Sequence, residues 1–372
     1  MNQLYNIISN WGGLFYIGIS FFVLISTASK NKYLEIFSIF SIFAFCIFFL
    51  GLRDTNSGTD TLNYITTLKY SINSARPEGW DYLFFLISKI LFNLNNPTVF
   101  IAGIVTIQLS LIIIVSHILK IENKVLVLFI YISLMPGFDM LTNGLRQGIS
   151  APIALIIFSL IFIKHKIPKI FLSVLIFLHK STLTYLASSI ALFFLKGKIE
   201  RFFFKAIFIL TISIIIFWHF FDFTSHVNKL SLLLQIQILD SGFLLGDKLS
   251  AYVTNDTDIL LGIFKYYFTF IAIFLMLPKL ILKESINSTN KKANITPIWF
   301  SVYIFSIIYA LVWISPYSYR FMYTMFLPGI IASVHATDKK KKTTFYIALG
   351  TFMLGILTYG SNTFINFKYI FQ

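Results

Sequence analysis

Apolar blocks recur along the whole chain, and this feature most limits what the chain can fold into. Each block is roughly 15–22 residues long, close to the ~20 residues that an α-helix needs to cross the hydrocarbon core of a bilayer. Only 12% of the 372 residues are charged, which is about half the share found in soluble domains. We therefore expect an all-α integral membrane protein, a polytopic helical bundle of about 12 spans, forming a single membrane domain over residues 1–372.

The expected spans follow from where the blocks begin and end. They are 12–29, 34–52, 97–117, 124–137, 145–163, 166–179, 181–195, 203–221, 259–278, 297–314, 319–336 and 343–360. The stretch 80–95 is apolar but short and carries Lys89, so we expect a re-entrant or interfacial helix there. If 80–95 spans instead, the block that fails to span is 124–137, which ends at Pro136-Gly137.

Basic residues lie mainly between the blocks, and this sets the orientation through the positive-inside rule. In this layout 19 of the 30 lysines and arginines lie in inner loops, and 10 of the 15 acids lie outside. Two longer segments, 53–96 and 222–258, then lie on the outer side, where long loops often bind or cover ligands. The net charge of +15 is spread over the loops, so the pattern argues against a nucleic-acid-binding protein.

The arginines are distributed differently from the lysines between the two expected sides of the membrane. Inner loops hold 18 of the 25 lysines. Four of the five arginines instead lie outside or near the outer ends of helices: Arg53, Arg76, Arg146 and Arg320. The guanidinium group is a planar fork that binds phosphate through two hydrogen bonds and stays charged when partly buried. We therefore expect an anionic ligand at the outer helix ends.

The first candidate constellation begins where the second expected span ends, at Gly51. Arg53 can hold a phosphate, and Gly58 permits a tight turn after it. Asp60 can accept a proton from a sugar hydroxyl or bind sugar hydroxyls, and Tyr64 can stack on a sugar ring. The alternative is a polar turn in which Arg53 pairs with a neighbouring acid.

The second constellation is Asn143-Gly144-Leu145-Arg146-Gln147-Gly148, at the outer start of an expected helix. Free N–H groups and the helix dipole make such an end attractive to anions. Arg146 adds a full positive charge at the same place, and Gln147 is the neighbour that we expect to contact substrate. An arginine that extends to the lipid interface is the alternative for Arg146.

The third constellation is His179-Lys180-Ser181, which interrupts the otherwise apolar stretch 166–195. One helix through this stretch would put His179 and Lys180 at mid-membrane, so we expect two short helices that meet at the break. Such a break is tolerated where it lines a protein or water cavity. His179 titrates near neutrality and can act as acid, base or hydrogen-bond donor. An outer turn without catalytic function is the alternative.

The fourth constellation lies in the outer turn 315–323. Tyr317, Tyr319 and Tyr323 fit an aromatic belt at the membrane interface. Arg320 is harder to explain in that way, because the residues that follow it are apolar. We expect Arg320 to face an anionic group, with Tyr319 beside it.

Signs of a metal or cofactor site are weak. The acidic pair Asp256 and Asp258 offers too few oxygen ligands for a divalent ion. Cys46 is the only cysteine, which excludes an intramolecular disulfide and a multi-cysteine zinc site. His-Glu-x-x-His, a Walker loop and Gly-x-Ser-x-Gly are all absent from the sequence, which argues against an ATP-driven pump or a serine hydrolase. We expect no metal and no cofactor.

Taken in order, these four constellations resemble one family. The arginine followed by Gly-Thr-Asp and tyrosine, the Asn-x-x-Arg-Gln helix start, the His-Lys-Ser break and the late outer arginine are spread over roughly 45–335. The chain is similar to the EpsG-like branch of the Wzy-type O-antigen and exopolysaccharide polymerases. The segment 222–258 matches the variable outer loop of that family only in position.

The resemblance implies a GT-C-like glycosyltransferase on the outer face of a bacterial plasma membrane. Its substrate would be an undecaprenyl-diphosphate-linked oligosaccharide, joined to the next repeat unit without a nucleotide; a chain-length regulator protein is a further expected partner. Arg146, Arg320 and Arg53 would neutralise the diphosphate leaving group, where charge develops. Asp60 or His179 would be the general base on the acceptor hydroxyl. Tyr64, Gln147, Lys180 and Tyr319 would bind substrate.

Three other functions remain open. An O-antigen ligase would use the same lipid carrier but is expected to have a larger outer domain. A flippase or another transporter usually shows two related halves and charges near the membrane midplane, and neither is visible in the sequence. An acyltransferase acting on surface glycan would use His179 but would leave the arginines unexplained.

Overall fold

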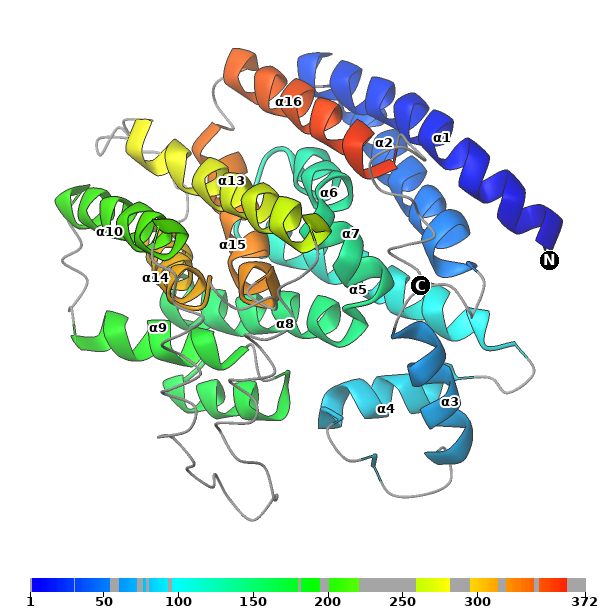
Figure 1. The fold of residues 1–372 in the computed structure, drawn as a ribbon, viewed down its shortest axis with the longest axis horizontal. Coiled ribbons are helices and arrows are strands. Elements are labelled where there is room, and N and C mark those ends of the chain that lie inside the picture. The colour runs from blue at the N-terminus through cyan, green and yellow to red at the C-terminus, as the bar shows by residue number, and fades with distance from the viewer. Residues whose placement is uncertain are drawn as a thin grey trace.

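The computed structural model describes residues 2–29, 31–53, 60–71, 76–77, 80–92, 96–179, 182–194, 201–220, 259–281, 295–313, 319–337 and 341–359. Within these ranges the regular structure is all helical, as Figure 1 shows. The expected all-α fold class is thereby confirmed for this part of the chain. The outer segment 222–258, with its acidic pair, lies outside the described residues.

The helices follow the apolar blocks of the sequence, with shorter elements where those blocks are interrupted. In chain order they are α1 (Asn2–Ser29), α2 (Lys32–Phe45), the π-helix η1 (Cys46–Gly51), α3 (Thr61–Ser71), α4 (Tyr82–Leu91), α5 (Thr98–Ile118), α6 (Lys124–Ser133), α7 (Met135–Thr142), α8 (Leu145–Phe162), the 3-10 helix η2 (Lys169–Phe177), α9 (Leu183–Phe194), α10 (Arg201–Phe220), α13 (Ile259–Ile281), α14 (Thr296–Leu311), α15 (Tyr319–Thr337) and α16 (Lys341–Tyr359).

Four of the described helical segments are long and apolar enough to cross a bilayer: Lys32–Gly51, Thr98–Ile118, Leu145–Phe162 and Phe202–His219. A fifth span results if the bent pair α6 and α7 is counted as one. The structure is therefore that of a helical membrane protein with four or five candidate spans in its described part. The total of about 12 spans stays a prediction.

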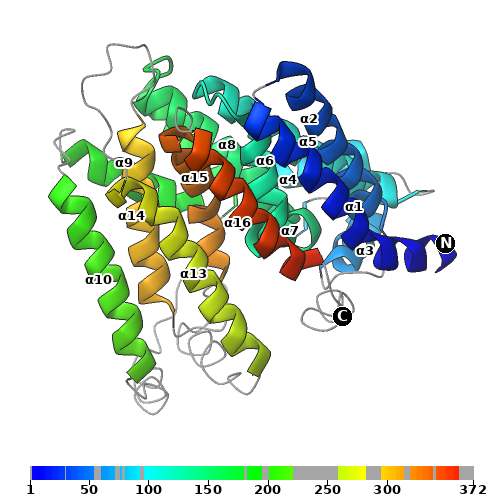
Figure 2. The same cartoon turned by 90° about the horizontal axis from the view of Figure 1, so that it is seen from above.

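Helix α6 forms the centre of the molecule, and every side chain from Val125 to Ser133 is buried. It contacts α1, α2, α5, α15 and α16, and α1 and α16 run side by side over it (Figures 1 and 2). Helices α1 and α6 are joined at Tyr16 of α1, whose hydroxyl donates to Ser133 Oγ of α6 at 2.8 Å. A Cβ at Gly355 would lie 1.8 Å from that same hydroxyl, so glycine is needed there for α16 to pack this closely.

The chain bends by 79° between α6 and α7, at Leu134. Pro136 lies in the first turn of α7, where proline lacks only an N–H that would be unpaired anyway. A Cβ at Gly137 would lie 1.8 Å from the carbonyl oxygen of Tyr131, so the sharp bend requires glycine. The expected span 124–137 is therefore a ten-residue helix followed by a bend, and α7 belongs to a broken span or a re-entrant loop.

The outer segment 53–96 folds on its own small core at one end of the molecule, where Figure 1 shows α3 and α4. Tyr64, Trp80 and Phe84 pack together there, against the first turns of α5 and α8. The expected short helix at 80–95 is α4, which has ten residues and a length of about 15 Å. This length is half of what a span needs, so α4 is too short to cross a bilayer by itself. It packs against α5.

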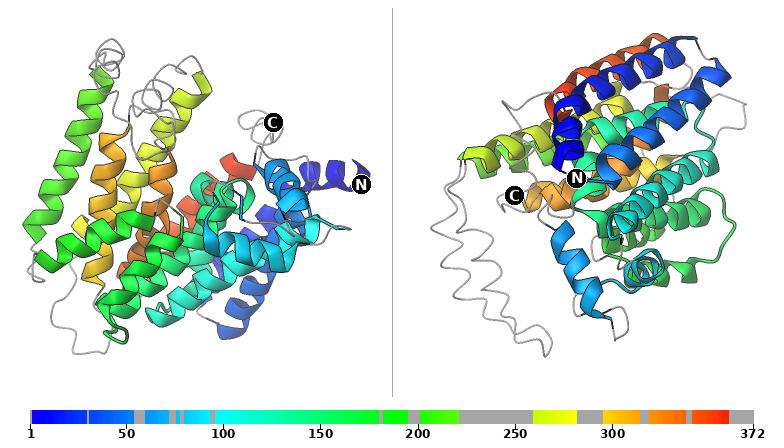
Figure 3. Two further views of the ribbon diagram at one scale, coloured as in Figure 1. Left: turned by 90° about the horizontal axis from the view of Figure 1, so that it is seen from below. Right: turned by 90° about the vertical axis from the view of Figure 1, so that its right-hand side faces the viewer.

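The stretch 166–195 contains two short helices, as the break at His179 predicts. The first of them differs from expectation, because η2 is a nine-residue 3-10 helix with a length of about 18 Å. Helix α9 has twelve residues and a similar length of about 18 Å. The two elements contact each other and α8. They lie beside α8 in Figure 3, at the edge of the bundle.

Basic loops gather at the end opposite the outer segment. Lys120 follows α5, and Lys164 and Lys166 follow α8. Partial desolvation first, and then the charges of Lys120 and Lys166, lower the pKa of Lys164. Since these loops belong to different helices, the clustering agrees with a common inner end in the positive-inside layout.

Candidate functional site

Asp139 lies in the last two turns of α7 and is half-buried. The side-chain amide of Asn143 donates to Asp139 Oδ1 at 2.9 Å, and the hydroxyl of Tyr323 donates to Oδ2. The backbone carbonyl of Asp139 accepts from the amides of Asn143 and Gly144 at 2.8 and 2.7 Å. Asp139 therefore ties α7 both to the start of α8 and to α15.

Arg53 lies beside this acid and is only 4% exposed. Its Nη1 donates to the carbonyl of Leu50, and its Nη2 donates to the carbonyl of Thr142 and, at 2.7 Å, to Thr61 Oγ1. Burial lowers the pKa of Arg53 to about 9, while the charge of Asp139 raises it. The guanidinium thus stays protonated at neutral pH and joins the end of η1 to α3 and α7. Its Nε is buried and meets no acceptor among the described residues.

Two further residues of the first constellation, Asp60 and Tyr64, lie just before α3 and on it. Asp60 is half-buried, and its carbonyl accepts from the amide of Tyr64 at 2.9 Å. The ring of Tyr64 is 7% exposed and packs against Trp80 and Phe84 at centroid distances of 5.6 and 5.5 Å. Sugar stacking by Tyr64 stays a prediction, and it would require the ring to leave this packing. Gly58 lies outside the described residues.

Arg146 lies in the first turn of α8 and is 28% exposed, the most accessible of the described arginines near Asp139. Its Nη1 is 3.7 Å from Oδ2 of Asp81, which precedes α4. The neighbouring Gln147 is 4% exposed. Arg146 thus contacts the outer segment through Asp81, and its side chain is partly exposed.

Gln108 of α5 contacts the start of α8. Its Nε2 donates to the carbonyls of Met140 and Leu145, at 3.1 and 3.3 Å. A Cβ at Gly148 would lie 2.5 Å from this carboxamide. The glycine of the second constellation therefore makes room for Gln108, which holds the ends of α7 and α8 in place.

His179 lies near the same end. Its backbone amide donates to the hydroxyl of Ser150 at 3.3 Å, and Ser150 is in the second turn of α8. The side chain of His179 is half-buried. The structure therefore brings His179 to the helix that carries Arg146, while Lys180 lies outside the described residues.

Tyr319 and Arg320 form the first turn of α15, and their side chains lie outside the described residues. Their place in the fold is nevertheless fixed by Tyr323, one turn further along, which bonds Asp139. Tyr323 is 2% exposed, so its assignment to an aromatic belt is wrong, because a belt residue would face the lipid interface. Tyr317 lies outside the described residues.

The described residues of the four constellations thus lie toward one end of the molecule, and the hydrogen bonds there include an acid, Asp139, that the sequence analysis did not select. One signal could have found it: Asp139 is the sole charged residue between Lys124 and Arg146. An ionisable residue inside an apolar block is a candidate functional residue by default. No group of three or more potential metal ligands occurs within the described ranges.

Comparison with known proteins identifies the family of this chain. Neither the curated proteins nor the solved structures contain a significant match to this chain. A family model, described as the EpsG family, matches residues 36–371. This range covers nearly the whole chain and includes all four constellations and Asp139. The chain therefore belongs to the EpsG family.

Proposed function

We propose that this protein is a polysaccharide repeat-unit polymerase of the outer face of a bacterial plasma membrane. Family membership suggests a glycosyltransferase-like polymerase in general. In our proposal the substrate is an oligosaccharide linked to undecaprenyl diphosphate, the spans number about twelve, and the architecture is GT-C-like. The observation that carries the proposal is that Arg53, the junction before the helix that bears Arg146, and the helix that bears Arg320 all meet Asp139.

The reaction has a simple balance of bonds. A hydroxyl of the acceptor sugar attacks the anomeric carbon of the donor, and a new glycosidic C–O bond forms. The bond from that carbon to the diphosphate oxygen breaks, and undecaprenyl diphosphate leaves with the electron pair. A base takes the hydroxyl proton. Negative charge grows on the departing diphosphate, so fixed positive charge there lowers the barrier.

Arg146 and Arg320 are the residues that we expect to meet the diphosphate. Arg146 is partly open at the start of α8, where helix N–H groups add to its charge. Arg320 is in the first turn of α15, one turn before Tyr323, which donates a hydrogen bond to Asp139. The Nη atoms of Arg53 already donate to protein oxygens. Its contribution is therefore mainly a buried positive charge that positions the surrounding elements.

Asp139 is better suited to holding the site than to accepting a proton. Both of its carboxylate oxygens accept hydrogen bonds from protein donors, so the carboxylate holds Asn143 and Tyr323 in place. The general base in this proposal remains Asp60 or His179, both half-buried near the site. Tyr319, Tyr64, Gln147 and Lys180 remain the proposed substrate-binding residues.

Loss and rescue in the source organism tests the function. The gene is deleted, and surface polysaccharide and lipid-linked sugars are then separated by size. We expect long chains to disappear and single repeat units to remain. Wild type should restore long chains, and Arg146→Ala should not. Arg76→Ala is the matched control, because Arg76 is also an outer arginine but is exposed and bonds only the Trp80 carbonyl among its described contacts.

Other outcomes point to other functions. Long chains that stay on the lipid carrier would indicate a ligase, and repeat units trapped on the inner face would indicate a flippase. Unchanged glycan after deletion would refute the polymerase proposal. Each variant also needs a measurement of its amount in the membrane, so that loss of the protein is not mistaken for loss of activity.

A further inference from the structure

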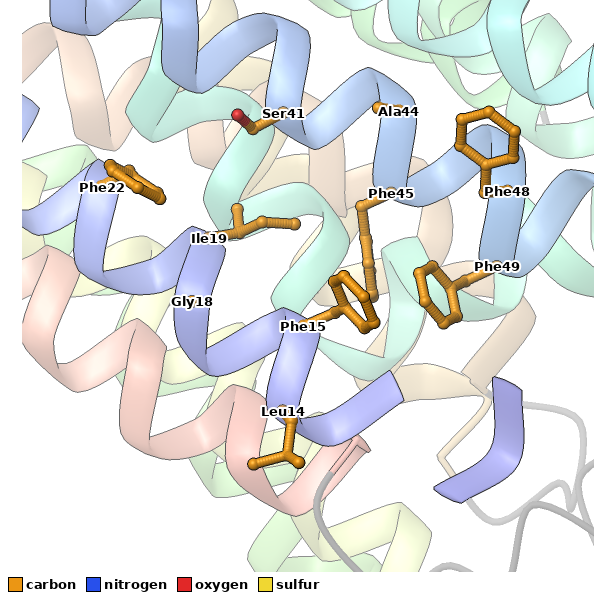
Figure 4. Close-up of a pocket in the computed structure, with 10 residues that line it drawn as sticks. All are labelled: Leu14, Phe15, Gly18, Ile19, Phe22, Ser41, Ala44, Phe45, Phe48 and Phe49. Atoms are coloured by element: carbon orange, nitrogen blue, oxygen red, sulfur yellow. The ribbon is translucent and has the colours of Figure 1, made fainter. Parts of the chain in front are cut away.

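An apolar groove of about 520 Å³ lies between α1 and the continuous helix of α2 and η1 (Figure 4). Its volume falls within the roughly 300–1,000 Å³ that is usual for small-molecule sites. Phe15 and Phe48 form open walls and are 52% and 61% exposed. Phe45 is 4% exposed and lies at the base of the groove. The groove therefore opens toward the lipid side of the helices.

The described lining of the groove is apolar. Among the described lining residues only Ser41 has a polar side chain, and its hydroxyl donates to the carbonyl of Phe37 at 2.9 Å. The aromatic walls hold one another in place: Phe15 and Phe49 lie 4.9 Å apart between ring centroids, and Phe45 and Phe49 lie 5.1 Å apart. An occupant with hydrogen-bonding groups would lose its water without compensation, so the groove fits a hydrocarbon chain.

Gly18 creates part of this space. It is exposed, lines the groove, and a Cβ built on it meets no atom within 4 Å. The glycines at 51, 137, 148, 329 and 355 differ, because a Cβ there would meet a neighbouring atom at 3.0 Å or less. Gly18 is therefore not needed for helix packing, although glycine weakens a helix interior by about 1 kcal/mol relative to alanine. Its effect in the structure is to leave room in the groove.

The groove leads toward the candidate site. Its lining on α2 and η1 runs from Ser41 to Phe49, and Arg53 follows four residues later. The opposite end of this helix starts at Lys32, in the loop assigned to the inner side. The groove therefore occupies the outer half of the helix pair, and a buried positive charge lies just beyond its outer end. This arrangement complements an amphiphile with a long apolar tail and an anionic head.

We infer that this groove binds the polyprenyl chain of the lipid-linked substrate, with the diphosphate directed past the buried charge of Arg53 toward Arg146. The inference rests on the proposed function and specifies where the lipid enters. The tail packs against the phenylalanine walls and over Gly18, and the sugar end extends toward Asp139. The polyprenyl tail is thus bound at one part of the α2–η1 helix, and the reaction takes place beyond the end of that helix.

Equilibrium binding to the full-length protein in nanodiscs of phosphatidylethanolamine and phosphatidylglycerol tests this inference. The probes are undecaprenyl diphosphate and farnesyl diphosphate, which share a head group and differ in tail length. Gly18→Leu fills the groove without meeting protein atoms near its Cβ. We expect it to weaken binding of undecaprenyl diphosphate by about tenfold, since several buried methylene groups lose their contacts, and to change farnesyl diphosphate binding less.

Gly350→Leu is the matched control. Gly350 is an exposed helical glycine in α16 whose Cβ also meets nothing within 4 Å, and it lies outside the groove. Its variant should bind both probes like wild type. If wild type and Gly18→Leu bind undecaprenyl diphosphate equally well, the groove is not the binding site of the polyprenyl chain. The polymerase proposal would remain intact. Failure of wild type to bind undecaprenyl diphosphate would instead count against the proposed function itself.

Two remaining outcomes would assign the groove to another occupant and so overturn the inference. One is that Gly18→Leu loses only co-purified phospholipid while undecaprenyl diphosphate binding is unchanged. The other is that it changes the oligomeric state measured by light scattering, which would make the groove a contact between two copies of the chain.

Discussion

Two apolar stretches of this protein are interrupted, one at the bend between α6 and α7 and one at His179. The two interruptions differ in the contacts that fix their geometry. The bend between α6 and α7 lies in the core, where a proline in the first turn of α7 and a glycine without room for a Cβ fix its geometry. The break at His179 lies between two short elements beside α8, and the backbone amide of His179 donates a hydrogen bond to Ser150 of that helix. The first break positions other residues, whereas the second presents a titratable side chain.

The comparison predicts that the core bend is the more sensitive to substitution. Gly137→Ala would place a Cβ 1.8 Å from the Tyr131 carbonyl and 2.9 Å from Phe326. Since neither atom can move far in a packed core, we expect a loss of roughly 3 kcal/mol or no folded protein. Thermal unfolding followed by size-exclusion chromatography measures this. Gly144→Ala is the control, because its nearest contact is 3.4 Å; equal stability of Gly137→Ala and wild type would refute the role of the bend.

Asp139→Ala should have the next largest effect. It removes the acceptor for Asn143 and Tyr323 and leaves the buried charge of Arg53 without this counter-charge. We expect a loss of about 2 kcal/mol together with loss of long polysaccharide chains. Tyr323→Phe removes one of these hydrogen bonds and should cost about 1 kcal/mol. If Asp139→Asn is as stable as wild type but does not restore long polysaccharide chains, activity depends on the charge of Asp139 and stability depends on its hydrogen bonds. Full activity of Asp139→Ala would exclude a positioning role.

The contact of Gln108 with Gly148 should appear as coupling between two substitutions. Gln108→Ala loses two hydrogen bonds to carbonyls, at a cost of about 1 kcal/mol. Gly148→Ala forces a Cβ against the carboxamide and should cost about 1–2 kcal/mol. The double variant should lose less than the sum by about 1 kcal/mol, because the clash disappears with the side chain. Additive losses would show that the two residues act independently.

His179→Ala should have the smallest effect on stability. The hydrogen bond from this position to Ser150 uses the backbone amide, which the substitution retains. We expect a change within about 0.5 kcal/mol but loss of long polysaccharide chains, if the imidazole takes part in proton transfer. Unfolding and glycan length are measured on the same variant. A stability loss as large as that of Gly137→Ala would show that both breaks are structural and would remove the contrast between them.

Much of the candidate site follows from local sequence patterns. Arg146 begins a helix because the apolar block after it defines that helix, and His179 lies at a break because charge is not tolerated at mid-membrane. Tyr323 was misassigned because a tyrosine near the end of an apolar block looks the same whether it faces lipid or a buried acid. Its bond to Asp139 joins residues 184 positions apart, and no local pattern contains that information.

The sequence by itself determined that this chain is a helical membrane protein, since the length and spacing of apolar blocks are set by bilayer thickness. It also determined the order of the four constellations and their resemblance to the EpsG family. The tertiary structure alone decided that Asp139 joins α7, α8 and α15, that the ring of Tyr64 packs inside the outer segment, and that Gly18 opens a groove. The physical reason is that these contacts depend on how helices pack across the bundle, whereas hydropathy along the chain records only which segments avoid water.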